Sequence, residues 1–216
     1  MTSSWQLYVI IDRAASGSRD LAELTTAAIR GGADAIQLRD KSASSAQLIR
    51  EATRLLPVTR AAGIPLIIND RVEVVDAVGA DGVHLGQDDG PIEEARRLLG
   101  STRLIGKSTH SLEQAIAADA EGADYIGFGP IFPTPTKPAY EHVGIALIGD
   151  VTRLVHVPVV CIGGIDRPAL QSVLAAGATC VAVVRAVCGA EDPQRAARQL
   201  KNALTQFVHT PVSPSL

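Results

Sequence analysis

Short apolar runs alternate with longer segments of helical periodicity along the whole chain. The runs have the length of buried strands and are bounded by turn residues. Strands are predicted at residues 7–11, 35–38, 66–68, 82–85, 104–106, 125–128, 159–162 and 180–184, and helices at 21–30, 46–62, 92–99, 112–121, 168–176 and 193–203. This alternation indicates an α/β protein with a parallel sheet.

A weak internal repeat marks alternate strands. Gly-Ala-Asp precedes the second, fourth and sixth predicted strands, at 32–34, 79–81 and 122–124, and Gly-Ala-Thr precedes the eighth, at 177–179. Each glycine is expected to end a helix in a left-handed conformation before the next strand begins. With eight predicted strands in 216 residues, the pattern favours a single-domain (β/α)8 TIM barrel over residues 1–208, with an open doubly wound sheet as the alternative.

Composition narrows the functional classes. A net charge of −3 and a pI near 5.9 argue against nucleic-acid or membrane binding driven by charge. The apolar run at 7–11 is too short to span a bilayer and lacks a basic leader, so a cytoplasmic location is expected. Cys161 and Cys180 lie in apolar runs and are predicted to be buried small hydrophobes. Residues 209–216 are predicted to form a flexible C-terminal tail.

Polar residues gather where the predicted strands end, which is where a (β/α)8 barrel carries its chemistry. Gln37, Arg39 and Lys41 share parity, so their side chains are expected to face the barrel mouth while Leu38 faces the helices. The alternative is a charged strand end in contact only with solvent. Further clusters lie at Asn69-Asp70, Gln87-Asp88-Asp89, Lys107-Ser108, Thr134-Pro135-Thr136-Lys137 and Gly163-Gly164. Together these groups suit a polyphosphate and a hard metal, so we expect an enzyme whose partners are phosphorylated small molecules; a homo-oligomer is left open.

Two carboxylates indicate a metal site. Asp70 closes the third predicted strand, and Asp89 follows the turn after the fourth. Carboxylates one strand apart on the same barrel face can bracket one Mg²⁺, which usually takes only one or two protein carboxylates. Asp70 could instead cap a helix that begins near Arg71.

Two further segments indicate anion contacts. The proline-rich loop 128–144 carries Thr134, Thr136 and Lys137, as a lid over a bound anion would, although it could equally be a surface connection. Gly163-Gly164 and Val184-Arg185 follow the last two strands, where backbone amides of many barrels bind phosphate; a tight turn is the alternative. The two histidines His84 and His110 are expected to be packed or hydrogen-bonded rather than catalytic bases.

Six of these motifs, taken in order from about residue 7 to 204, resemble the thiamine-phosphate synthase family. They are Gln37-Leu38-Arg39-Asp40-Lys41, Asn69-Asp70-Arg71, His84-Leu85-Gly86-Gln87-Asp88-Asp89, Ser108-Thr109-His110, Gly129-Pro130 with Thr134-Pro135-Thr136-Lys137, and Ile162-Gly163-Gly164-Ile165. The resemblance implies that the diphosphate ester of 4-amino-5-hydroxymethyl-2-methylpyrimidine alkylates the ring nitrogen of a thiazole phosphate. Thiamine phosphate and pyrophosphate would be the products, with Mg²⁺ required and C–O cleavage preceding attack.

The resemblance also implies residue roles. The pyrimidine diphosphate would be bound by Gln37, Leu38, Arg39, Asp40, Lys41, Asn69, Ser108 and Lys137, and the metal by Asp70 and Asp89. The thiazole phosphate would be contacted by Thr134, Thr136, Gly164, Val184 and Arg185, and the catalytic groups would be Arg39, Lys41, Ser108 and Lys137. The family usually has serine where this chain has Arg185.

Three other functions fit parts of the pattern. A thiazole tautomerase on the same barrel would resemble the synthase but tends to lose the diphosphate and metal residues, which are present here. A Schiff-base aldolase would use Lys107 or Lys137 as its amine. A non-catalytic module would bind thiazole phosphate without any dependence on Mg²⁺.

Overall fold

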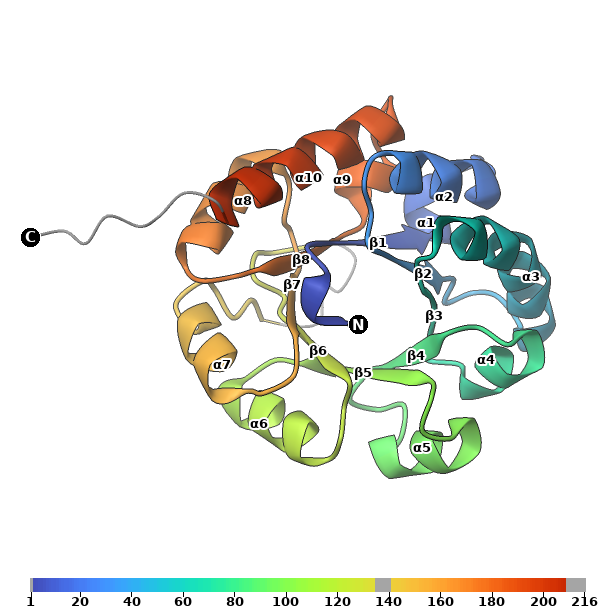
Figure 1. The fold of residues 1–216 in the computed structure, drawn as a ribbon, viewed down its shortest axis with the longest axis horizontal. Coiled ribbons are helices and arrows are strands. Elements are labelled where there is room, and N and C mark those ends of the chain that lie inside the picture. The colour runs from blue at the N-terminus through green and yellow to red at the C-terminus, as the bar shows by residue number, and fades with distance from the viewer. Residues whose placement is uncertain (1, 135–140, 209–216) are drawn as a thin grey trace, which may run out of the picture.

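The chain folds into a closed parallel barrel. A computed structural model describes residues 2–134 and 141–208. Within these residues eight strands pair in chain order, and β8 pairs with β1 to close the barrel. Helices surround the barrel as an outer ring (Figure 1). The predicted TIM barrel is confirmed, and the open doubly wound sheet is wrong.

The strands lie where the apolar runs predict them. They are β1 (Leu7–Asp12), β2 (Ala35–Arg39), β3 (Leu66–Asn69), β4 (Gly82–Leu85), β5 (Leu104–Thr109), β6 (Tyr125–Phe128), β7 (Val159–Ile162) and β8 (Cys180–Val183). The largest difference is in β5, which continues through Lys107 and Ser108 instead of ending before them. The polar residues of this strand therefore belong to the barrel wall.

The six predicted helices are confirmed, with ends that shift by a few residues. The helices are α1 (Arg13–Ser16), α2 (Leu21–Arg30), α3 (Ser45–Ala62), α4 (Val72–Val78), α5 (Ile92–Leu99), α6 (Leu112–Ala120), α7 (Ile148–Leu154), α8 (Arg167–Ala175), α9 (Arg185–Cys188) and α10 (Pro193–Val208), after a 3-10 turn, η1 (Thr2–Ser4). The list of predicted helices lacked α1, α4, α7 and α9, although a helix beginning near Arg71 was considered as an alternative. A helix of four to seven residues makes at most two turns, so its apolar positions show no period.

The aspartates of the Gly-Ala-Asp repeat tie neighbouring strands together at the base of the barrel. Asp34 Oδ2 accepts the backbone N–H of Leu7, at the start of β1, at 2.8 Å. Asp81 Oδ2 accepts from Leu66 at 2.8 Å, at the start of β3, and Asp124 Oδ2 accepts from Ile105 at 2.7 Å, in β5. Each repeat thus satisfies an amide of the preceding strand that the ladder leaves unpaired.

The same base carries two ion pairs and the predicted glycine turns. Lys201 of α10 lies 2.7 Å from Asp34, and Arg96 of α5 lies 2.6 Å from Asp124. The repeat glycines have positive φ angles, for example 69° at Gly79, which confirms the left-handed helix ends.

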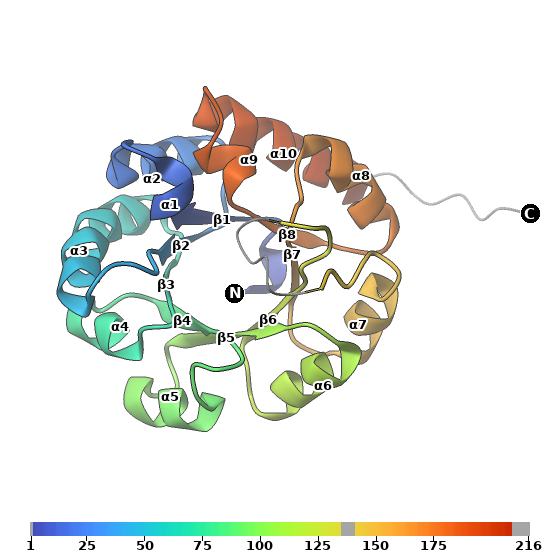
Figure 2. The same ribbon diagram turned by 180° about the vertical axis from the view of Figure 1, so that it is seen from behind.

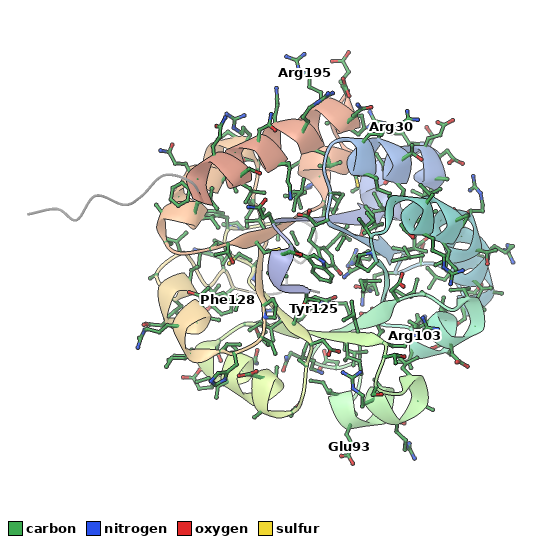
Figure 3. The ribbon with its side chains drawn as sticks, viewed as in Figure 1. Arg30, Glu93, Arg103, Tyr125, Phe128 and Arg195 are labelled. Atoms are coloured by element: carbon green, nitrogen blue, oxygen red, sulfur yellow. The ribbon has the colours of Figure 1, made fainter. Side chains whose placement is uncertain are left out.

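Aromatic side chains fill the lower barrel. Trp5 lies 5.7 Å from Tyr8 and 5.4 Å from Tyr125 between ring centroids, and all three are buried. In Figure 3, Tyr125 points into the barrel, whereas Glu93 and Arg195 point to solvent from the outer ring. The turn η1, which leads into Trp5, lies across the barrel opening in Figure 1. The base is therefore closed, and the carboxyl ends of the strands form the mouth, which faces the viewer in Figure 2.

The three cysteines are free and buried, which confirms the prediction for Cys161 and Cys180. Burial raises the pKa of the Cys161 thiol to about 12. In the part of the chain that the structure describes, no helix combines the length and the apolarity needed to cross a bilayer.

Candidate functional site

A cavity of about 370 Å³ opens at the mouth, and each of the eight strands contributes to its lining. Its walls are apolar near Ile10, Val160 and Ala182, while polar groups lie around them. Several residues that the sequence singled out line this one cavity: Gln37, Arg39, Asn69, Ser108, Thr134, Gly164, Val184 and Arg185. An apolar recess with a polar surround suits a flat heterocycle that carries an anionic tail.

Two predicted residues point elsewhere. The Leu38 side chain is buried in the core between strands and helices, as its parity predicts. The Asp40 carboxylate accepts hydrogen bonds from the amides of Ser42, at 3.0 Å, and Ala43, at 3.2 Å, within its own loop. Neither side chain lines the cavity. Lys41, Asp70 and Asp89 are outside the cavity lining as well. Thr136 and Lys137 lie outside the residues that the structure describes.

The two cations predicted to face the mouth each pair with an aspartate. Arg39 Nη1 donates to Asp12 Oδ2, and Lys41 Nζ donates to Asp70 Oδ2. Gln37, two residues earlier, is buried and donates to the Tyr8 hydroxyl at 2.9 Å. The interpretation of this segment as a charged end in contact only with solvent is wrong, because Arg39 is largely enclosed.

Asp70 and Asp89 come together at the mouth beside Lys41. Burial, followed by the hydrogen bond to Asp89, raises the pKa of Asp70, although Lys41 opposes the shift. Burial also raises the pKa of Asp89, but hydrogen bonds with Asp70 and the Gly86 amide outweigh it and lower that pKa. The two carboxyl groups titrate as a pair, and Asp70 keeps a proton to the higher pH.

The backbone at Asp70 also has an unusual conformation. Asp70 is the non-glycine residue with positive φ, 65°, among those described. The N-cap of α4 is Arg71, with no side-chain cap hydrogen bond, so the alternative role of Asp70 as a helix cap is wrong. A left-handed aspartate costs backbone energy, and such strain clusters at functional sites.

The carboxylate pair fits Mg²⁺. Both side chains offer oxygen, the ligand atom that Mg²⁺ prefers. The hydrogen bond to Asp89 helps to raise the pKa of Asp70, and a cation bound between the two carboxylates would lower that pKa again. Among the residues described, no group of three or more His, Cys, Asp or Glu side chains converges. This small ligand set suits Mg²⁺, since Mg²⁺ usually completes its octahedron with substrate phosphate oxygens and water.

Lys107 braces the loop that carries Asp89, a role that the sequence did not reveal. Its Nζ donates to the carbonyl oxygens of Gly86, at 2.8 Å, and Gly90, at 3.0 Å. The side chain is buried outside the cavity lining. As a Schiff-base nucleophile Lys107 is misplaced, because its amine is held by two carbonyls and does not reach the cavity.

A chain of hydrogen bonds runs from the predicted diphosphate ligand Ser108 down into the barrel. His84 Nε2 lies 2.9 Å from Ser108 Oγ, and His84 Nδ1 lies 3.1 Å from the Tyr125 hydroxyl. The Tyr125 hydroxyl lies 3.0 Å from that of Tyr8. Burial raises the pKa of both tyrosines, so both stay neutral. His84 is thus hydrogen-bonded, as predicted, and so is His110, whose Nδ1 contacts the Gly129 carbonyl oxygen.

Glycines shape the opposite wall of the cavity. Gly163 and Gly164 have φ angles of 105° and 65°, and a Cβ at Gly163 would lie 2.5 Å from Pro130 Cα. The tight-turn interpretation is therefore right for Gly163. Both glycines nevertheless line the cavity with Thr134 and Arg185, so the turn also exposes backbone to a ligand.

Comparison with known proteins gives one consistent result. The family described as thiamine monophosphate synthase matches residues 7–187. A curated thiamine-phosphate synthase of Roseiflexus castenholzii is 48% identical over 201 residues, which cover 93% of this chain and 88% of that protein. One of Chloroflexus aurantiacus is 49% identical over 198 residues, 91% of each. The solved thiamine phosphate pyrophosphorylase from Pyrococcus furiosus is 36% identical with a TM-score of 0.86, covering 94% of this chain and 97% of that one.

Proposed function

The chain belongs to the thiamine monophosphate synthase family, and from this premise we propose a Mg²⁺-dependent coupling of two substrates. One substrate is 4-amino-2-methyl-5-(diphosphooxymethyl)pyrimidine, and the other is thiazole phosphate. The products are thiamine phosphate and pyrophosphate. The new C–N bond joins the pyrimidine methylene to the thiazole nitrogen, and the broken C–O bond leaves its electron pair on pyrophosphate.

The observation that carries this proposal is the carboxylate pair Asp70–Asp89 with Lys41 beside it, at the same barrel face as the cavity that Arg39 lines. Lys41 pairs with Asp70, and Arg39, two residues earlier, supplies positive charge to the cavity. Because Asp70 and Asp89 keep oxygen ligands close together, a cation between them would be shared with a diphosphate. A tautomerase acting on the thiazole alone has no need of this set.

We propose a dissociative reaction, in which the main barrier is separation of charge. The departing pyrophosphate gains negative charge, so donors held in advance around it lower the barrier most. Arg39, Lys41 and Ser108 are the described donors for this role, and Lys137 would join them. One such donor is worth ~2.7–4 kcal/mol, roughly a hundred- to thousandfold in rate. Mg²⁺, when held by Asp70 and Asp89, would neutralise further charge on the same leaving group.

The pyrimidine and the thiazole phosphate would occupy different walls. Gln37 and Asn69 line the cavity near Arg39 and would orient the polar edge of the pyrimidine. On the glycine wall, Gly164 and Val184 would offer backbone N–H groups to the thiazole phosphate, assisted by the Thr134 hydroxyl and, outside the described residues, by Thr136. Arg185 adds a guanidinium where the family usually has serine, which would strengthen binding of the phosphate.

Pyrophosphate release by the purified chain tests the proposal. Release is expected only when the pyrimidine diphosphate, thiazole phosphate and Mg²⁺ are all present, together with formation of thiamine phosphate. A folded protein that aromatises the thiazole but releases no pyrophosphate would instead be a tautomerase. Binding of thiazole phosphate without turnover, and without any effect of Mg²⁺, would indicate a binding module.

A further inference from the structure

Asp12 is a buried acid that the proposed reaction does not use. It is the last residue of β1, and its strand partner in the β1–β2 register is Arg39. The side chain of Asp12 is 3% exposed and that of Arg39 is 13% exposed, so water competes little for their ion pair. Arg39 lines the cavity, whereas Asp12 does not.

We infer that Asp12 is a positioning residue, which holds the Arg39 guanidinium in the orientation that receives the diphosphate. The inference builds on the proposed function, because it assigns Asp12 to the residue proposed to contact the leaving group. Asp12 itself touches no substrate. Its effect reaches the reaction through Arg39.

The charge of Asp12 argues for a geometric role. A carboxylate next to a cation reduces the attraction of that cation for an anion, so Asp12 weakens the electrostatic pull of the site. A guanidinium has five N–H donors. Among the described residues, Asp12 is the acceptor for one donor of Arg39, its Nη1. The remaining donors stay available for phosphate oxygens, while the long side chain loses its rotamer freedom before the ligand arrives.

Helix capping accounts for only one oxygen of Asp12. Its Oδ1 accepts the Ala15 N–H at 3.0 Å and so caps α1. Asparagine or serine would cap a helix as well as aspartate. The second oxygen, Oδ2, is the one that faces Arg39. A carboxylate is needed here only if the contact with Arg39 matters.

The chain contains a matched control on its outer surface. Asp20 caps α2 through Oδ1, which accepts from Ala22 at 2.8 Å and Glu23 at 3.1 Å, while its Oδ2 pairs with Arg54. The groups are the same as at Asp12, but these side chains are 36% and 48% exposed and lie outside the cavity lining. Asp20→Asn therefore removes an equivalent pair far from the substrates.

Steady-state kinetics on the full chain test the inference. Asp12→Asn and Asp12→Ser both keep a cap acceptor and remove the charged partner of Arg39. Each is expected to lower kcat/KM for the pyrimidine diphosphate by about 10- to 100-fold, because a misplaced donor loses much of its effect. KM for thiazole phosphate should change less than about twofold, and Asp20→Asn should leave all constants within about twofold of the parent.

A double-mutant cycle separates positioning from a structural role. In an Arg39→Gln background, Asp12→Asn should change kcat/KM by less than about twofold, because its target is already gone. The inference would be overturned if the losses of kcat/KM from the two substitutions were additive, or if Asp12→Asn lowered kcat/KM equally for both substrates. It would also be overturned if Asp12→Asn caused no loss although the unmodified protein is active. Failure of both variants to fold would overturn it as well, since Asp12 would then serve stability. Pyrophosphate release by the unmodified protein is measured before any variant is made. If the unmodified protein releases none, the proposed function is overturned, and the inference about Asp12 is not what failed.

Discussion

Both rims of the barrel carry aspartates, but their oxygens meet different groups. At the base, Asp34, Asp81 and Asp124 accept backbone N–H groups, and Asp34 and Asp124 also pair with a cation. At the mouth, Asp70 and Asp89 face each other, with Lys41 as a shared neighbour. Within the described residues, the base aspartates meet only amides and cations, whereas Asp70 and Asp89 also face each other, although Asp70 accepts from Lys41 and Asp89 accepts from the Gly86 amide.

This difference separates stability from chemistry within one residue type. A carboxylate whose acceptors are filled by amides stabilises the fold and has little left to offer a ligand. Two carboxylates in contact repel each other, and that cost is relieved when a cation binds between them. The immediate neighbours of each aspartate therefore indicate its role, in agreement with the general division of TIM barrels into a catalytic and a stabilising face.

Removing the mouth pair should produce the largest effect. Asp70→Asn keeps the shape and suits the left-handed backbone at φ 65°, since asparagine tolerates that conformation. Pyrophosphate release should fall by about two to three orders of magnitude, because the variant loses half of the proposed metal site. The melting temperature without Mg²⁺ should not fall, since carboxylate repulsion is relieved. An unchanged Mg²⁺ titration would remove Asp70 from the metal site.

The opposite result is expected at the base. Asp34→Ala leaves the amides of Gln6 and Leu7 without their acceptor and unpairs Lys201. We expect a loss of about 2–3 kcal/mol in the free energy of unfolding, mostly from the two amides because the ion pair is partly exposed. That corresponds to about 5–10 °C in melting temperature by calorimetry. Activity at 25 °C should stay near that of the parent; a selective loss of activity in a stable variant would break the comparison.

The two lysines that each bridge two oxygens offer a sharper test. Lys107→Met should free the loop 86–90 and weaken Mg²⁺ binding by about tenfold, as loss of an outer contact to a metal ligand typically does. Lys201→Met at the base is the matched control, expected to lower the melting temperature slightly and leave Mg²⁺ binding unchanged. Calorimetric titration with Mg²⁺ measures both. Equal affinities in the two variants would show that Lys107 does not support Asp89.

The smallest effect is expected from thiol reagents. Burial raises the pKa of Cys161 to about 12 and also raises that of Cys180 and Cys188. Because the reactive form is the thiolate, a raised pKa keeps the thiols protonated and inert at pH 8. A chromogenic disulfide reagent at pH 8 should therefore react with the thiols, seen as an increase in absorbance, only after denaturant is added. Rapid reaction of the folded protein would mean that β7, β8 or α9, which carry these cysteines, opens readily.

Much of the fold could be predicted because buried parallel strands are short apolar runs with clear ends. The prediction ended β5 too early, since Lys107 and Ser108 are polar and polar residues usually follow a strand. Here Lys107 reaches two loop carbonyls and Ser108 faces the cavity, so both are accommodated within the strand. Contacts between distant loops leave no periodic signal in the sequence.

The site was predictable only in part. Strand-end position was enough to bring Asp70 near Asp89 and to place Arg39 at the mouth. The role of Asp12 depends on the register that sets it beside Arg39, and a sequence does not state that register. For the Gly-Ala-Asp repeat, backbone geometry was enough to predict that the glycine ends a helix. The hydrogen bonds that the aspartates accept from backbone N–H groups of the preceding strands could be identified only in the folded barrel.

Closure of the base by Trp5, Tyr8 and Tyr125 leaves the mouth as the route by which both substrates enter and both products leave. Two molecules that enter through the same opening cannot pass each other freely inside the cavity. We therefore expect the substrate in the deeper position to bind first. In this way the aromatic floor of the barrel would order the binding steps, although none of its rings needs to touch the atoms that react.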